Sequence, residues 1–154
     1  MALRLLAFLP CEKIIIADSG VVSLISILER VFIELPKDVD SPPSDAIAPI
    51  AWSVYALWER DTADLKTEQV YEQRVQLVLP DGTDWAPSGA IPNLTLTFAP
   101  GITRVRAIRP LLGFPVAMSG HATLILSIRG DEGEGWREAA TYRLEVSHQV
   151  VPRD

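Results

Sequence analysis

Two long apolar runs open the chain and meet at a tight turn. Residues 3–9 and 14–16 form the first run, residues 21–35 form the second, and Asp18-Ser19-Gly20 lies between them. The β-branched residues in both runs favour extended backbone. Asp and Ser are turn residues, and a glycine accepts the positive φ of a bulged hairpin. We therefore expect a hairpin that begins an all-β fold and supplies much of its core.

The second run also carries a weaker helical pattern. Ser23, Ser26, Arg30 and Glu34 recur at spacings of three and four residues, which would give a helix one polar stripe. Against this pattern stand six β-branched residues, which are Val21, Val22, Ile25, Ile27, Val31 and Ile33. We favour a strand, and the open alternative is an α+β fold with a helix near residues 21–35.

Alternating apolar and polar positions predict the remaining strands. Residues 50–60 place Trp52, Val54, Ala56 and Trp58 on one parity, and the stretches 69–79, 91–98, 102–108, 121–129 and 137–150 follow, separated by Pro, Gly and Asp. About eight strands with short turns predict an antiparallel β-sandwich of the Greek-key type. We expect a single domain over residues 1–154, with a Pro/Asp-rich surface loop at 36–49.

The strand pattern resembles a known family. The second run reads Ser-Gly-Val-Val-Ser-Leu-Ile-Ser-Ile-Leu-Glu-Arg over residues 19–30, and the closing strand contains Tyr-Arg-Leu-Glu-Val over residues 142–146. This order, with a Pro-rich loop between, is similar to an uncharacterised bacterial family of single β-sandwich domains. The resemblance implies that fold and a bacterial origin, and it implies no functional residues.

The composition indicates that a large amount of apolar surface has to be buried. Hydrophobic residues make up 48% of 154 residues, charged residues only 22%, and the mean hydropathy is +0.19. Either several strands are buried on both faces, or a partner covers part of the surface, as at obligate interfaces.

The charge balance bears on partners and location. A net charge of −6 disfavours nucleic acid and anionic membranes as partners. The apolar start of the chain is too short for a signal peptide, and no stretch is long enough for a transmembrane helix. The one cysteine, Cys11, has no internal disulfide partner and is expected to pack as a small hydrophobe. By default we expect a cytoplasmic protein with no cofactor.

Acidic loop residues are the weak candidates for a metal site. Strands that alternate in direction would collect several loops at one end of the sandwich, and these loops carry Asp18, Asp61, Asp64, Asp131, Glu132 and Glu134. Calcium prefers such oxygen ligands, but no loop has an ordered Asp-x-Asp-x-Asp spacing. Solvated turns are the favoured interpretation.

No residue set predicts catalysis. His121 and His148 fall at the opposite end and lack the short spacing of zinc ligands. Neither Ser88 nor Ser119 lies in a nucleophile elbow. We therefore expect a protein that is not an enzyme.

Four residues are candidates for an interaction surface. Arg104 and Arg106 share a parity and would form a basic stripe, either for an acidic partner or paired across strands with Glu72 or Glu145. Tyr55 and Leu57 lie on the second parity of residues 50–60, which is either core or an oligomer surface.

Three functions follow as hypotheses. The first is a non-enzymatic β-sandwich module that acts through protein–protein contact and self-associates. The second is calcium or small-ligand binding through the acidic loops. The third is a structural subunit of a phage or secretion-type assembly.

Overall fold

Nine strands make up the fold of the part of the chain that the computed structural model describes, which comprises residues 3–36, 42–43, 45–85, 91–116, 118–130 and 133–151. They are β1 (Leu3–Ile16), β2 (Val22–Ile27), β3 (Arg30–Pro36), β4 (Ile47–Arg60), β5 (Gln69–Val78), β6 (Leu94–Phe98), β7 (Arg104–Pro115), β8 (Gly120–Arg129) and β9 (Arg137–Val151). One short 3₁₀ turn, Thr62–Asp64, follows β4. Among these residues no helix is long and apolar enough to cross a bilayer.

The strands form two sheets, which confirms the predicted all-β fold. One sheet has the order β2-β1-β4-β7 and the other the order β3-β9-β8-β5-β6. The chain crosses between sheets from β4 to β5 and from β7 to β8, so that β4 pairs with β7 while β5 pairs with β8, as in Greek-key sandwiches. One pair departs from the expected antiparallel pattern, because β3 and β9 are parallel.

The alternative prediction of a helix near residues 21–35 is wrong, and the prediction of one continuous strand over this run is wrong as well. The run divides into β2 and β3, which lie in different sheets. The break begins at Ser26, whose φ is 54°, and the buried Leu28 donates its N–H to the carbonyl of Pro10 at 3.0 Å. The β-branched residues therefore form two strands. The polar residues at helical spacing do not mark a helix, and the chain passes from one sheet to the other between these strands.

The core lies between the sheets, as the parity of β4 predicts. Trp52 and Trp58 are buried, and each indole N–H has a partner: the carbonyl of Gly113 at 2.8 Å and the side-chain oxygen of Gln73 at 2.7 Å. A buried tryptophan that satisfies its polar atom contributes both area and orientation. Residues of β5, β8 and β9 at alternating positions, Leu77, Leu124, Leu126, Ile128 and Leu144 among them, complete this layer.

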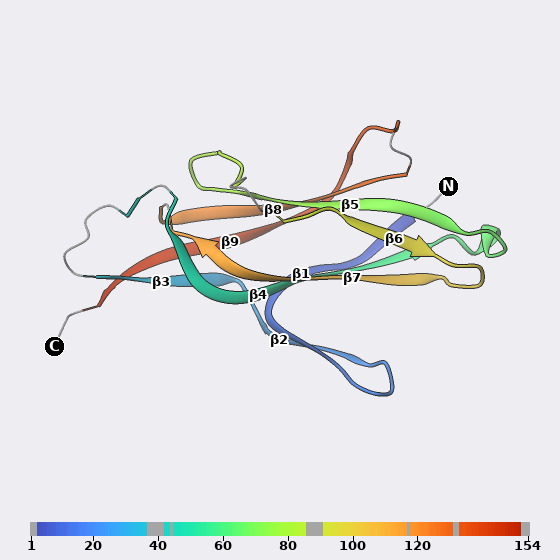
Figure 1. The fold of residues 1–154 in the computed structure, drawn as a ribbon, viewed down its shortest axis with the longest axis horizontal. Helices are drawn as coiled ribbons and strands as arrows, with labels where there is room; N and C mark the ends of the chain where they lie inside the picture. The colour runs from blue at the N-terminus through green and yellow to red at the C-terminus, as the bar shows by residue number, and fades with distance from the viewer. Residues whose placement is uncertain are drawn as a thin grey trace.

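Strand β1 of the four-stranded sheet changes its pairing partner along its length. The first half of β1 pairs with β4 and the second half with β2, with Cys11 at the changeover. Beyond that point the hairpin leaves the body of the sandwich as a separate arm (Figure 1). Its turn is the one expected at residues 17–20, with Gly20 at a φ of 83°.

Candidate functional site

The outer face of the four-stranded sheet brings together the residues predicted for interaction. On β4, Tyr55, Leu57 and Glu59 alternate with the core tryptophans, and β7 sets Ile108, Arg106 and Arg104 opposite them. Because directly opposed residues of an antiparallel pair share a face, these six side chains lie on one surface, away from the second sheet.

Two of the four predicted residues are covered there rather than open. Tyr55 is only 7% exposed and Leu57 is half-buried, although neither belongs to the core between the sheets. The hairpin returns to this face at its tip, where Arg106 Nη2 donates to the carbonyl of Gly20 at 2.7 Å. The chain's own hairpin, not the loops of the second sheet, therefore lies beside this part of the face.

The arginines have other partners than those expected. Glu59 accepts from Arg104 at 2.7 Å and also from Arg4, and these hydrogen bonds, first that of Arg104, lower the pKa of Glu59. Glu72 and Glu145 pair with Arg129 and Arg30 instead. Both expected partners lie in the five-stranded sheet, so that strand β7 cannot reach them by cross-strand pairing.

The arm carries the densest group of exposed aliphatic side chains on the described chain. We call this group the hairpin surface, and it comprises Ile15, Ile16, Val21, Ile25 and Ile27, each at least 40% exposed. The other large aliphatic residues of the arm are Ile14, Val22 and Leu24, which are half-buried. Residues 14–28 contain one charged residue, Asp18 at the turn.

Cys11 lies fully buried at the base of the arm. Burial raises the pKa of its thiol, so that the reactive thiolate is scarce near neutral pH. This agrees with the expectation of a small hydrophobe.

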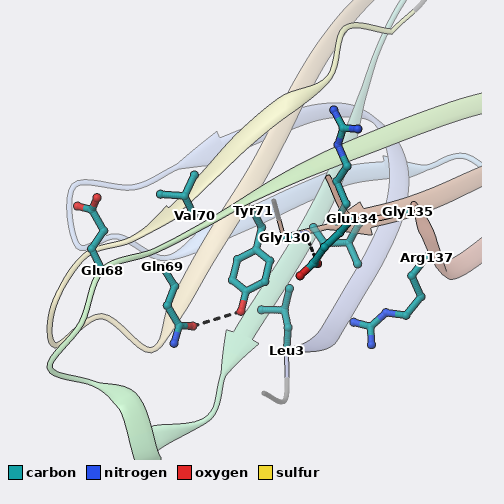
Figure 2. Close-up of a pocket in the computed structure, with 11 residues that line it drawn as sticks. Leu3, Glu68, Gln69, Val70, Tyr71, Gly130, Glu134, Gly135 and Arg137 are labelled. Atoms are coloured by element: carbon teal, nitrogen blue, oxygen red, sulfur yellow. Dashed lines mark hydrogen bonds between the residues drawn. The ribbon is translucent and has the colours of Figure 1, made fainter. Parts of the chain in front are cut away.

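A pocket of about 560 Å³ lies at the end of the sandwich where β5 begins and β8 ends (Figure 2). Leu3, Tyr71 and Ile128 give it an apolar floor. Glu68, Arg129, Glu134 and Arg137 supply its charges, and Glu134 accepts the backbone N–H of Gly130 at 3.1 Å. Such a pocket suits a small ligand with apolar and charged parts.

The acidic candidates do not gather in one place among the residues described. Glu134 lies in the end pocket, Asp61 caps the 3₁₀ turn through Ala63 N–H at 3.2 Å, and Asp18 lies on the hairpin turn. Asp131, Glu132 and the side chain of Asp64 are outside the described set. Within that set no three His, Cys, Asp or Glu side chains form a group that could hold a metal ion.

The two histidines lie apart. The register sets His121 opposite Glu145 on the outer face of the five-stranded sheet, and His148 opposite Ile33 on the inner face. His148 Nε2 is buried without a hydrogen-bond partner in the described structure, in keeping with a residue packed at the rim.

Arg60 is the residue that the sequence analysis missed most clearly. It ends β4, is 2% exposed, and its guanidinium donates to four carbonyls, those of Leu65, Thr67, Ala99 and Ile102. It thus joins the loop after β4 to the loop after β6. The available signal was its place on the core parity of β4, where a charge must be satisfied internally.

Trp136 was also missed. Its ring packs against two guanidinium groups, with the Cζ atoms of Arg74 and Arg129 at 4.4 and 4.5 Å from the ring centroid. These contacts fix the end of the loop between β8 and β9 on the outer face of the five-stranded sheet.

Comparison with solved structures shows a weak similarity of fold. The chain is similar to the protein described as "Structure of the N-terminal domain of PorA", with a TM-score of 0.34 and 12% sequence identity, over 93% of this chain and 98% of that one. No family model matches the sequence, and no curated protein does.

Proposed function

We propose that this chain is a non-enzymatic β-sandwich module that acts through protein–protein contact and self-associates through the hairpin surface. The observation that carries the proposal is the exposure of Ile15, Ile16, Val21, Ile25 and Ile27 on one projecting arm. Strand alternation puts Ile15, Val21, Ile25 and Ile27 on one face of the hairpin, where Lys13 is the neighbouring charge. An exposed apolar group of this kind is typical of interaction sites. The buried thiol of Cys11 and the separated histidines support a role without catalysis.

The same proposal includes membership of the bacterial single-domain β-sandwiches that the strand pattern resembles. It also extends to larger particles, in which this chain would be a structural subunit of a phage or secretion-type assembly. A cytoplasmic location stays a prediction of the sequence.

Light scattering at increasing protein concentration tests self-association. We expect the apparent mass of the native chain to rise from monomer to dimer. Ile25→Glu should stay monomeric, because it charges the hairpin surface while placing a carboxylate opposite Lys13 within the hairpin. Val70→Glu is the matched control, since Val70 is also aliphatic and 48% exposed but lies on β5, in the other sheet. A native chain that stays monomeric throughout, or two variants that behave alike, contradicts the proposal.

The end pocket carries a second candidate function, the binding of calcium or a small ligand. Its support is the cavity of about 560 Å³, whose lining holds the carboxylates of Glu68 and Glu134 together with the guanidinium groups of Arg129 and Arg137. We expect about millimolar calcium to raise the melting temperature of the native chain and not that of Glu134→Ala. An unchanged melting temperature in both chains overturns calcium as the ligand.

A further inference from the structure

The hydrogen bonds of the hairpin turn fix which backbone groups of β2 are free. Ala17 N–H donates to the carbonyl of Val21 at 2.9 Å, which makes these two residues a hydrogen-bonded pair. Such pairs alternate with non-bonded pairs along an antiparallel ladder, so that Ser23 and Ile25 also bond to β1. The N–H and C=O groups of Val22 and Leu24 therefore point away from β1, along an edge of the sheet.

The other edges of the two described sheets carry features that discourage pairing. Strand β7 contains Pro110 and Pro115, and its register with β4 shifts between Ala48 and Ala51. Strand β3 carries Arg30, Glu34 and Pro36. Strand β6 has five residues, and Arg109 of β7 reaches the carbonyls just before it. Proline, charge, irregular register and short length all protect strand edges.

Strand β2 differs from these edges. Its sequence, Val-Ser-Leu-Ile-Ser-Ile, has neither proline nor charge. Its one irregular residue, Ser26, lies near the end of the strand and leaves the stretch from Val22 to Ile25 regular. An apolar edge of this kind is a template for another strand.

We propose that a second copy of the chain adds to this edge, with the two β2 strands antiparallel and related by a two-fold axis at Leu24. The two four-stranded sheets then form one continuous sheet. The inference rests on the proposed function and specifies its partner and its geometry. An isologous contact of this kind closes as a dimer and leaves the β2 edge of neither copy free.

The sequence of β2 fits a second copy of itself. A register centred on Leu24 sets the half-buried Leu24 beside Leu24 of the second copy and the exposed Ile25 beside its Ser23, all within the regular stretch of β2. Each chain has a net charge of −6, which opposes association of two copies in general. The contact adds no like-charge pair within the strand, because the only charge in residues 14–28 is Asp18, outside β2.

Disulfide trapping tests the register. In a Cys11→Ala background, Leu24→Cys places two thiols across the axis at the separation of a hydrogen-bonded strand pair, about 5.5 Å between Cα atoms, which a disulfide spans. We expect mild oxidation to convert most of the protein to a covalent dimer. Val70→Cys in the same background is the control and should stay uncrosslinked. A Leu24→Cys chain that dimerises by light scattering yet does not crosslink overturns the register.

Proline substitution tests the edge itself. Leu24→Pro removes an N–H that points away from β1, whereas Leu24→Ala shortens the same side chain and keeps the N–H. We expect the alanine variant to retain the dimer and the proline variant to lose it, while circular dichroism shows both folded. If both variants dimerise, the edge proposal fails although self-association stands; if the native chain is monomeric, the proposed function fails first.

Discussion

The hairpin arm and the body of the sandwich are built from the same aliphatic and β-branched residues, with opposite results. In the body, Val54, Leu77 and Leu126 are at most 1% exposed, and the indole N–H groups of Trp52 and Trp58 are hydrogen-bonded. On the arm, Ile16, Val21 and Ile27 are 53%, 63% and 47% exposed. The difference is that a second layer covers the body, whereas only the tip of the arm is bonded back to the sheet, through Arg106. Apolar sequence alone therefore does not distinguish the residues of the core from those that are exposed.

If this comparison holds, changes in the body lower stability and leave association unchanged. The largest effect is expected for Arg60→Leu, which leaves four carbonyls of two loops without their donor. We expect a loss of about 3–5 kcal/mol in the free energy of unfolding by urea. The control is Arg104→Leu, because the side chain of Arg104 is 59% exposed and its ion pair should contribute at most about 1 kcal/mol. Equal losses in both variants would show that burial does not set the role of Arg60.

A smaller loss is expected at the indole of Trp58. Trp58→Phe removes the N–H donor to the side-chain oxygen of Gln73, which is 3% exposed, and leaves a small void, so that we expect a loss of about 1–3 kcal/mol in the free energy of unfolding. The double variant Trp58→Phe/Gln73→Leu removes both partners and should recover part of that loss in urea unfolding. A double variant that is less stable than the sum of the single changes contradicts this account of the pair.

The stability of the body of the sandwich should also fall with acid, through the protonation of Glu72. The hydrogen bond from Arg129 lowers the pKa of Glu72 below its ordinary 4.5, so that ionised Glu72 stabilises the fold at higher pH. This contribution is lost as the pH falls from about 4.5 through the lowered pKa. We expect the melting temperature of Glu72→Gln to fall less steeply with acid than that of the native chain, and Glu68→Gln, at an exposed position, to follow the native curve. Parallel curves for all three chains would be the contrary outcome.

The smallest effect on stability belongs to the arm. At a concentration where the chain is monomeric, Ile25→Glu should change the free energy of unfolding by at most about 0.5 kcal/mol, as for other exposed positions. Urea unfolding of the dilute variant and native chain measures this difference. A loss as large as that of the Trp58 variant would place Ile25 in the packed body and remove the contrast.

The sequence contained much of the fold and little of the arm's geometry. Alternation placed Trp52 and Trp58 in the core, and Asp18-Ser19-Gly20 marked the first turn, because both signals are local. The division of residues 21–35 between two sheets, and the parallel pairing of β3 with β9, depend on contacts with distant strands. The same holds for the site. Parity grouped Tyr55 with Leu57 and Arg104 with Arg106. It could not show that the hairpin turn bonds to Arg106, or that Glu59 forms ion pairs with both Arg4 and Arg104.

Hydrogen exchange at the amide of Leu24 tests the central claim most directly. The N–H of Leu24 points away from β1, so that only association through the β2 edge can protect it. We predict fast exchange in dilute protein and slowed exchange as the concentration rises, while the Ser23 amide, bonded to β1, stays protected throughout. Fast exchange at Leu24 in a sample that light scattering shows to be dimeric would contradict the account.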